Sequence, residues 1–262
     1  MSRAARERTA GAPESGLVAT GEATAAERAV KTSRGEQTRA QILDAALELF
    51  RDHGYEGTTM RAIAGAAGVA VGNAYYYFRS KESLIQEFYR RTHHEHLAAC
   101  ADVLAGDRDF RARLRGVMRA KVDTIMPYHR FAGVLFKTAA DPASPLNPWS
   151  AASAPLRRES TELFAEVVGG SRLRVKGELR AALPALLWTY HMGVVLYWIH
   201  DTSVGCKRTY RLVDDSVELV TRLISLSRLP PLRPVVRFAL RLGAGPEGEA
   251  QEAGPPQDDS AT

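Results

Sequence analysis

The chain has 262 residues, 45% of them hydrophobic and 25% charged, a composition that excludes a disordered or fibrous protein and allows one large or two modest globular domains. Its two cysteines, Cys100 and Cys206, lie far apart without a CxxC motif, which excludes a disulfide framework and indicates a reducing compartment. The net charge of +5 is not by itself evidence for nucleic-acid binding, because residues 36–96 contain seven basic and eight acidic residues.

The two ends of the chain differ in composition from its middle. Residues 1–33 are rich in Ala, Glu, Arg, Thr and Gly without apolar periodicity, which predicts a disordered N-terminal arm. No apolar segment follows the first arginines, so a secretory signal is not expected. Residues 229–262 are expected to form a largely disordered tail. Arg28, Lys31 and Arg34 are candidates for contacts with DNA flanks, although a solvated arm is the more frequent case.

The stretch 58–81 carries the most informative local pattern. It opens with two threonines of the N-cap type, Thr58 and Thr59, followed by apolar residues at helical spacing. Gly68 suits the sharp exit from that helix, and a second short helix is expected over 70–77. The stretch contains no Asp or Glu. Two short helices joined by a glycine turn predict a helix-turn-helix DNA-binding motif over 59–78.

The same stretch contains the pattern AGV-x-x-G-x-x-YYYF-x-SKE, here Ala67-Gly68-Val69, Gly72, Tyr75-Tyr76-Tyr77-Phe78 and Ser80-Lys81-Glu82. Through this pattern, residues 35–96 resemble the tetracycline-repressor family of bacterial regulators. The resemblance implies an all-α fold with two domains. An N-terminal three-helix helix-turn-helix DNA-binding domain would occupy 36–96, and a larger helical effector-binding and dimerisation domain would occupy 97–228.

The expected DNA contacts follow from the motif. By match to the family, Arg61 would face the DNA from the first helix of the motif and would contact a base or a phosphate. Val71 and Asn73 open the recognition helix, where Asn suits adenine and Val suits a thymine methyl. Many family members carry a polar residue at the position of Val71, so shape is expected to carry much of the specificity. The hydroxyl groups of Thr59, Tyr75 and Tyr76 are candidates for contacts with DNA phosphates. Lys81, at the start of the next helix, is a further candidate. The predicted DNA-binding residues are Thr59, Arg61, Ala70, Val71, Gly72, Asn73, Tyr75, Tyr76 and Lys81.

Apolar periodicity and helix breakers predict further helices at about 36–53, 81–104, 109–126, 130–140, 150–168, 177–200 and 207–227. The segment 181–199 contains no Lys, Arg, Asp or Glu and is long enough to span a membrane. Its proline, its histidine and its amphipathic aromatics favour a helix buried on nearly every side. The family's four-helix dimer bundle implies the same burial.

The resemblance also implies a small-molecule pocket in the larger domain. His191 among aromatic residues would provide one polar anchor in an apolar cavity, so the effector is expected to be apolar or aromatic. The predicted pocket residues are Phe131, Trp149, Trp188, His191, Met192, Val195 and Trp198.

His93, His96 and Cys100 share one face of the helix at 81–104. A metal site would need a fourth ligand from elsewhere, and a half-exposed pocket rim is favoured instead. No metal and no cofactor is expected.

The helix at 207–227 carries an apolar stripe at three- and four-residue spacing. Two helices per chain that cannot bury their faces alone imply a two-fold homodimer. The predicted dimer interface consists of Leu212, Val213, Val217, Val220 and Ile224.

No nucleophile elbow, P-loop, HExxH or dinucleotide fingerprint occurs in the sequence, so an enzyme is not expected. The sequence predicts a cytoplasmic, nucleoid-associated transcriptional regulator that binds double-stranded DNA as a homodimer. It would be a repressor released from a palindromic operator by a small-molecule effector, without a membrane partner. Two alternatives remain open: a ligand-independent DNA-binding or partner-binding protein of the same fold, and a membrane protein with a cytoplasmic DNA-binding head.

Overall fold

The computed structural model describes residues 19–227, 229, 231, 234, 236–238, 240 and 241. Within these residues the chain is helical and contains no strand, so the predicted all-α fold is confirmed. The expectations for residues 1–18 and for most of the tail at 229–262 lie outside the described residues.

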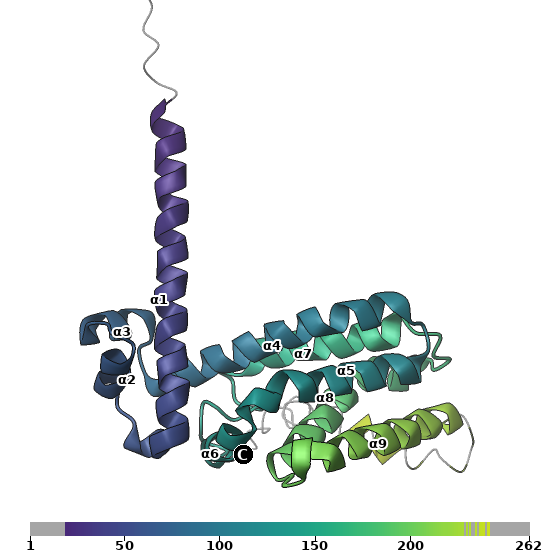
Figure 1. Cartoon of the computed structure of the whole chain (residues 1–262). Helices are drawn as coiled ribbons and strands as arrows, with labels where there is room; N and C mark the ends of the chain where they lie inside the picture. Colours follow the sequence, from purple (N-terminus) through teal and green to yellow (C-terminus); the bar gives the residue numbers. More distant parts are fainter. Residues whose placement is uncertain are drawn as a thin grey trace, which may run out of the picture.

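Three helices form the N-terminal unit (Figure 1): α1 (Ala19–Gly57), α2 (Met60–Ala66) and α3 (Val71–Tyr77). The helical backbone of α1 is interrupted at Gly54, whose φ of 76° suits a residue without a Cβ atom. Together with the first turns of α4, these helices enclose a small core that includes Phe50, Ile63 and Phe78. This core holds α2 and α3 in a fixed orientation.

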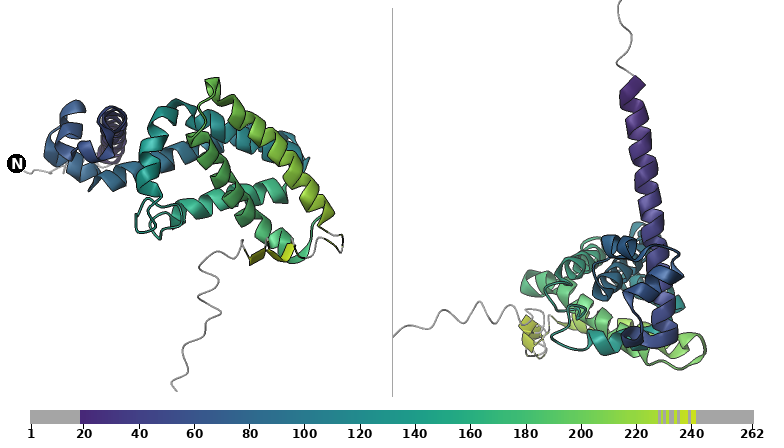
Figure 2. Two further views of the ribbon diagram at one scale, coloured as in Figure 1. Left: turned by 90° about the horizontal axis from the view of Figure 1, so that it is seen from below. Right: turned by 90° about the vertical axis from the view of Figure 1, so that its left-hand side faces the viewer.

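The start of α1 differs from the expectation. The helix begins at Ala19, not near Glu36, and it projects from the molecule as a long rod (Figures 1 and 2). Residues 19–33 are therefore helical, which corrects the expectation of disorder for that part of the arm. Ala, Glu, Arg and Lys have high helix propensity and extend an existing helix without a new nucleation step. Apolar periodicity misses such an extension because it detects only helices that pack.

One long helix, α4 (Lys81–Gly106), connects the two units. Its N-terminus is fixed by a capping box, in which the Ser83 backbone N–H donates to Ser80 Oγ and the Ser80 backbone N–H donates to Ser83 Oγ. Its first turns belong to the small core through Leu84, and its later turns belong to the larger core through Cys100. The expected domain boundary after residue 96 thus falls inside one continuous helix.

The larger unit consists of α5 (Phe110–Ile125), α6 (His129–Ala139), α7 (Ala154–Gly169), α8 (Gly177–Ile199) and α9 (Lys207–Leu226). Buried Arg113 on α5 donates hydrogen bonds to the backbone carbonyls of Leu104, Asp107, Glu166 and Val167. These bonds satisfy a buried guanidinium and tie α5 to the ends of α4 and α7. The three helices tied in this way, α4, α5 and α7, form part of the wall of a cavity.

Candidate functional site: a DNA-facing surface and an internal cavity

The turn between α2 and α3 has the geometry of a helix-turn-helix motif. Thr59 caps α2, because its Oγ1 accepts a hydrogen bond from the Ala62 backbone N–H at 3.2 Å. Gly68 takes a φ of 67°, which allows the chain to leave α2 sharply and to enter α3 after Ala70. Within α3 only Ala74 is buried, so nearly the whole recognition helix faces outward.

The predicted DNA-binding residues on α2, α3 and their caps lie at the surface. Tyr76 is 80% exposed, Tyr75 50% and Val71 39%, which is unusual for large hydrophobic side chains on a seven-residue helix. The other members of this set, all exposed, are Thr59, Arg61, Ala70, Gly72 and Asn73. The surface contains no carboxylate between Gly57 and Lys81, so it presents donors to a polyanion without repulsion.

Lys81 lies in a different environment from that expected of a phosphate contact. It is half-buried, and its Nζ donates a hydrogen bond of 2.6 Å to the backbone carbonyl of Tyr55. The same ammonium lies 4.2 Å from the centre of the Tyr55 ring, whose hydroxyl donates to Glu82 at 2.7 Å. Lys81 therefore fixes the start of α4 against the end of α1, and this intramolecular role was missed at the sequence level.

A cavity of about 620 Å³, partly open to the surface beside Trp149 and Leu196, lies in the larger unit, within the range of small-molecule pockets of roughly 300–1,000 Å³. Its walls come from α4, α5, α6, α7 and α8 and from the loop between α6 and α7. Every residue predicted for the pocket lines it, namely Phe131, Trp149, Trp188, His191, Met192, Val195 and Trp198. Helical spacing placed the predicted α8 residues on one face of that helix. Phe131 on α6 and Trp149 on the loop after α6 were predicted from their aromatic side chains.

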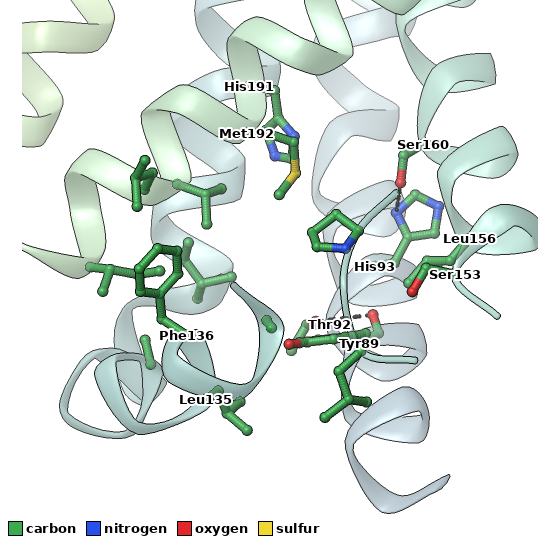
Figure 3. Close-up of a pocket in the computed structure, with 18 of the residues that line it drawn as sticks. Tyr89, Thr92, His93, Leu135, Phe136, Ser153, Leu156, Ser160, His191 and Met192 are labelled. Atoms are coloured by element: carbon green, nitrogen blue, oxygen red, sulfur yellow. Dashed lines mark hydrogen bonds between the residues drawn. The ribbon is translucent and has the colours of Figure 1, made fainter. Parts of the chain in front are cut away.

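The cavity also holds buried polar groups without protein partners. His191 is 6% exposed, and neither of its ring nitrogens makes a hydrogen bond to a described residue. Figure 3 shows His191 and His93 entering the cavity from facing walls, with His93 Nδ1 bonded to Ser160 Oγ at 3.4 Å. Burial lowers the pKa of His93 to about 4 and that of His191 well below its usual value. Both imidazoles are therefore neutral at pH 7.

His93, His96 and Cys100 are buried, which corrects the expectation of a half-exposed rim. Only His93 of the three lines the cavity, and His96 Nε2 is 2.9 Å from the carbonyl oxygen of Val117. Among the residues that the structure describes, no three His, Cys, Asp or Glu side chains are grouped as metal ligands.

Lys121, a cavity residue on α5, was not among the predicted pocket residues. It lies four residues after Val117 and three after Met118, both fully buried, so the apolar face of the helix already pointed to it. Burial lowers the pKa of Lys121 to about 8.

Phe131 belongs both to the cavity wall and to the small core. Its ring stacks on Phe50 of α1 with centroids 6.0 Å apart, and it meets Phe88 of α4 edge-on at 5.8 Å. Leu135, also on α6, takes part in the same two environments. The cavity and the helix-turn-helix unit are thus in direct contact through α6.

Two family models match the chain. The model for bacterial regulatory proteins of the tetR family matches residues 42–88, and the model for the tetracycline repressor-like C-terminal domain matches residues 113–242. The chain belongs to the tetracycline-repressor family. The first match contains the α2–α3 motif, and the second contains most of the cavity walls.

Curated relatives of this family match the N-terminal part. The transcriptional repressor KstR2 of Rhodococcus jostii is 34% identical over 98 residues, which is 37% of this chain and 48% of the relative. The regulator BetI of Burkholderia thailandensis is 35% identical over 94 residues, 36% of this chain and 48% of the relative. The chain thus spans about half the length of these relatives.

Solved structures share the fold over a longer range. A TetR-family regulator from Syntrophomonas wolfei has a TM-score of 0.58 at 16% identity, covering 71% of this chain and 95% of that chain. FadR from Bacillus subtilis, solved in complex with stearoyl-CoA, has a TM-score of 0.55 at 18% identity, covering 70% and 97%. These likenesses show that both units adopt the tetracycline-repressor fold.

The predicted dimer stripe on α9 needs correction. Val213, Val217 and Ile224 are buried in the chain's own core, and Leu212 and Val220 are half-buried. The core face of α9 lies against α5, where Arg119 pairs with Asp214 at 2.6 Å. A second apolar stripe remains exposed on the opposite face, formed by Leu219 (57%), Leu223 (42%) and Leu226 (47%). Spacing identified an apolar face of this helix but not the neighbour that covers it.

Within the described residues, α8 is the one helix long and apolar enough to cross a membrane, with a mean hydropathy of 1.3 over its most apolar window. Leu183, Leu187, Val194 and Trp198 are buried in the larger core, and His191 is buried at the cavity. Only 33% of that window is buried, and Thr189, Leu196 and Tyr197 are exposed, so within one chain α8 is not buried on nearly every side as expected.

Proposed function

We propose that this protein is a DNA-binding transcriptional regulator of the tetracycline-repressor family that acts as a homodimer on a palindromic operator. The observation that carries the proposal is the outward face of α3, which is exposed, free of carboxylates and joined to α2 by the sharp turn at Gly68. In a dimer, two copies of α3 would enter successive major grooves, roughly 34–36 Å apart. A cytoplasmic location follows from this role.

Direct base contacts would be few. Asn73 is exposed near the start of α3 and would bind an adenine edge, whereas Val71 beside it offers only apolar contact with a thymine methyl. The hydroxyls of Tyr75 and Tyr76 and the guanidinium of Arg61 would contact phosphates and hold the register. Operator choice would then rest partly on DNA shape.

A small molecule that fills the cavity would cause the protein to release DNA. The cavity wall includes α4 and α6, and Phe131 on α6 contacts α1 and α4 of the DNA-binding unit. A ligand that favours one placement of these helices would shift the population between DNA-binding and released states. Ligand and DNA must then weaken each other's binding by the same factor.

Selection of random duplexes by the purified protein tests the DNA-binding role. We expect a palindrome with fixed half-site spacing, and Asn73→Ala should relax the preference at one base pair in each half-site. Glu162→Gln, a change at an exposed position of α7 outside the cavity, is the control and should select the same palindrome. Failure of the folded wild-type dimer to enrich any sequence would contradict the proposal.

The alternative is a DNA-binding or partner-binding protein that uses this fold without an effector. The cavity, with its unpartnered histidine, favours the ligand-responsive form. A ligand-induced loss of operator affinity distinguishes the two.

A further inference from the structure

Lys121 occupies an unusual position for a lysine. It projects from the apolar face of α5 and lines the cavity, between buried Val117 and Ile125 in neighbouring turns. It makes no hydrogen bond and no ion pair within the part of the chain that the structure describes. Its side chain is half-buried, and a cation partly withdrawn from water without a counter-charge is destabilising unless something else compensates it.

The groups around Lys121 do not supply that compensation. Burial and, second to it, the positive charge of Lys121 lower the pKa of the His93, His96 and His191 imidazoles. These imidazoles are therefore neutral donors and acceptors, not competing cations. Glu159 is 48% exposed and approaches His93 Nε2 at 3.7 Å, without pairing with Lys121. Coulombic attraction to Cys100 and then to exposed Glu95 raises the pKa of Lys121 by less than burial lowers it. Burial raises the pKa of the Cys100 thiol to about 12, so this thiol is uncharged at pH 7.

We propose that the cavity takes an anionic amphiphile, an apolar molecule with one negative group such as a carboxylate, whose negative end pairs with Lys121. His191, with both ring nitrogens unpartnered, would donate a second hydrogen bond to the same group. Phe131, Leu135 and Trp188 would enclose the apolar body. A neutral ligand would bury Lys121 further without a counter-charge, and a cationic ligand would add repulsion. This inference rests on the proposed ligand-binding role of the cavity.

The test uses matched probes on the full-length chain. Anilinonaphthalene sulfonate and phenylnaphthylamine share an aromatic skeleton and differ by the negative group, and dodecanoate and dodecanol form an aliphatic pair. In the wild-type protein we expect each anion to bind about tenfold more tightly than its neutral counterpart, the effect of one charge-assisted hydrogen bond. Equal or weaker binding of both anions would overturn the proposal without any variant being needed.

Lys121→Met keeps the length and apolar stem of the side chain and removes the charge. We expect it to abolish the preference for the anions while leaving the neutral probes bound at least as tightly. Lys207→Met, an exposed lysine at the start of α9 and outside the cavity, is the matched control and should behave as the wild type. Persistence of the anion preference in Lys121→Met would overturn the assignment.

A parallel measurement of operator binding keeps this inference separable from the proposed function. If dodecanoate binds through Lys121 but leaves DNA affinity unchanged, the anion site stands and the release step fails. If the neutral probes release DNA and the anions bind no more tightly than their neutral counterparts, the release step stands and the anion site fails.

Discussion

Arg61 and Lys81 are both basic residues of the DNA-binding unit, but their surroundings give them different roles. Arg61 is exposed on α2 and makes no hydrogen bond or ion pair with another residue in the described part of the chain. Lys81 donates to the Tyr55 carbonyl and packs on the Tyr55 ring. Only the first is free to neutralise a phosphate.

Arg61→Ala should therefore reduce the slope of log affinity against log salt by about one, because one fewer counterion is released on binding. Lys81→Ala should leave that slope unchanged and lower the free energy of unfolding by about 1 kcal/mol, the value of one hydrogen bond. Salt titrations with the selected operator and urea unfolding separate the two effects. An equal fall in slope for both variants would mean that Lys81 also contacts DNA.

At the scale of elements, α6 is the link between cavity and DNA-binding unit. Phe131 and Phe136 both lie on α6 and both line the cavity, but only Phe131 stacks on Phe50 of α1. Phe136 instead meets His200 edge-on, with ring centroids 5.8 Å apart. The two phenylalanines thus form a natural pair for testing how a ligand affects α1.

Phe131→Leu should leave ligand affinity within about threefold but reduce the ligand-induced loss of operator affinity, since it removes a ring contact that both sites share. Phe136→Leu should change the ligand-induced loss much less. Operator binding measured with and without saturating ligand tests this. If both variants respond to ligand as the wild type does, the coupling runs through α4 instead.

At the scale of the whole molecule, the exposed stripe on α9 is the surface best suited to a second copy. Leu219, Leu223 and Leu226 are 57%, 42% and 47% exposed along one face of α9. Exposed apolar residues grouped on one face of a helix mark association sites in soluble proteins.

The double variant Leu219→Glu, Leu223→Glu should shift the protein from dimer to monomer and weaken operator binding by at least tenfold, because half-sites would no longer be bound together. Ser225→Glu adds a charge to another exposed face of α9 and should remain dimeric. Sedimentation or light scattering gives the mass of each. A double variant that stays dimeric would place the interface elsewhere.

The sequence alone determined the features that depend on local chemistry. Cap residues, Gly68 and the apolar spacing of α2 fixed the helix-turn-helix motif, and periodicity placed the helices of the larger unit close to their observed bounds. The aromatic residues of the cavity were also identifiable, because one face of α8 collects them.

Only the tertiary structure decided which surfaces meet. Helical spacing shows that Val213 and Val217 share a face, but the neighbouring helix decides whether that face is core or interface. Likewise, Lys121 looks ordinary in sequence, and it becomes a candidate anion site only because four other helices close a cavity around it without a carboxylate partner. Burial and partnership are properties of packing, and packing depends on residues distant along the chain.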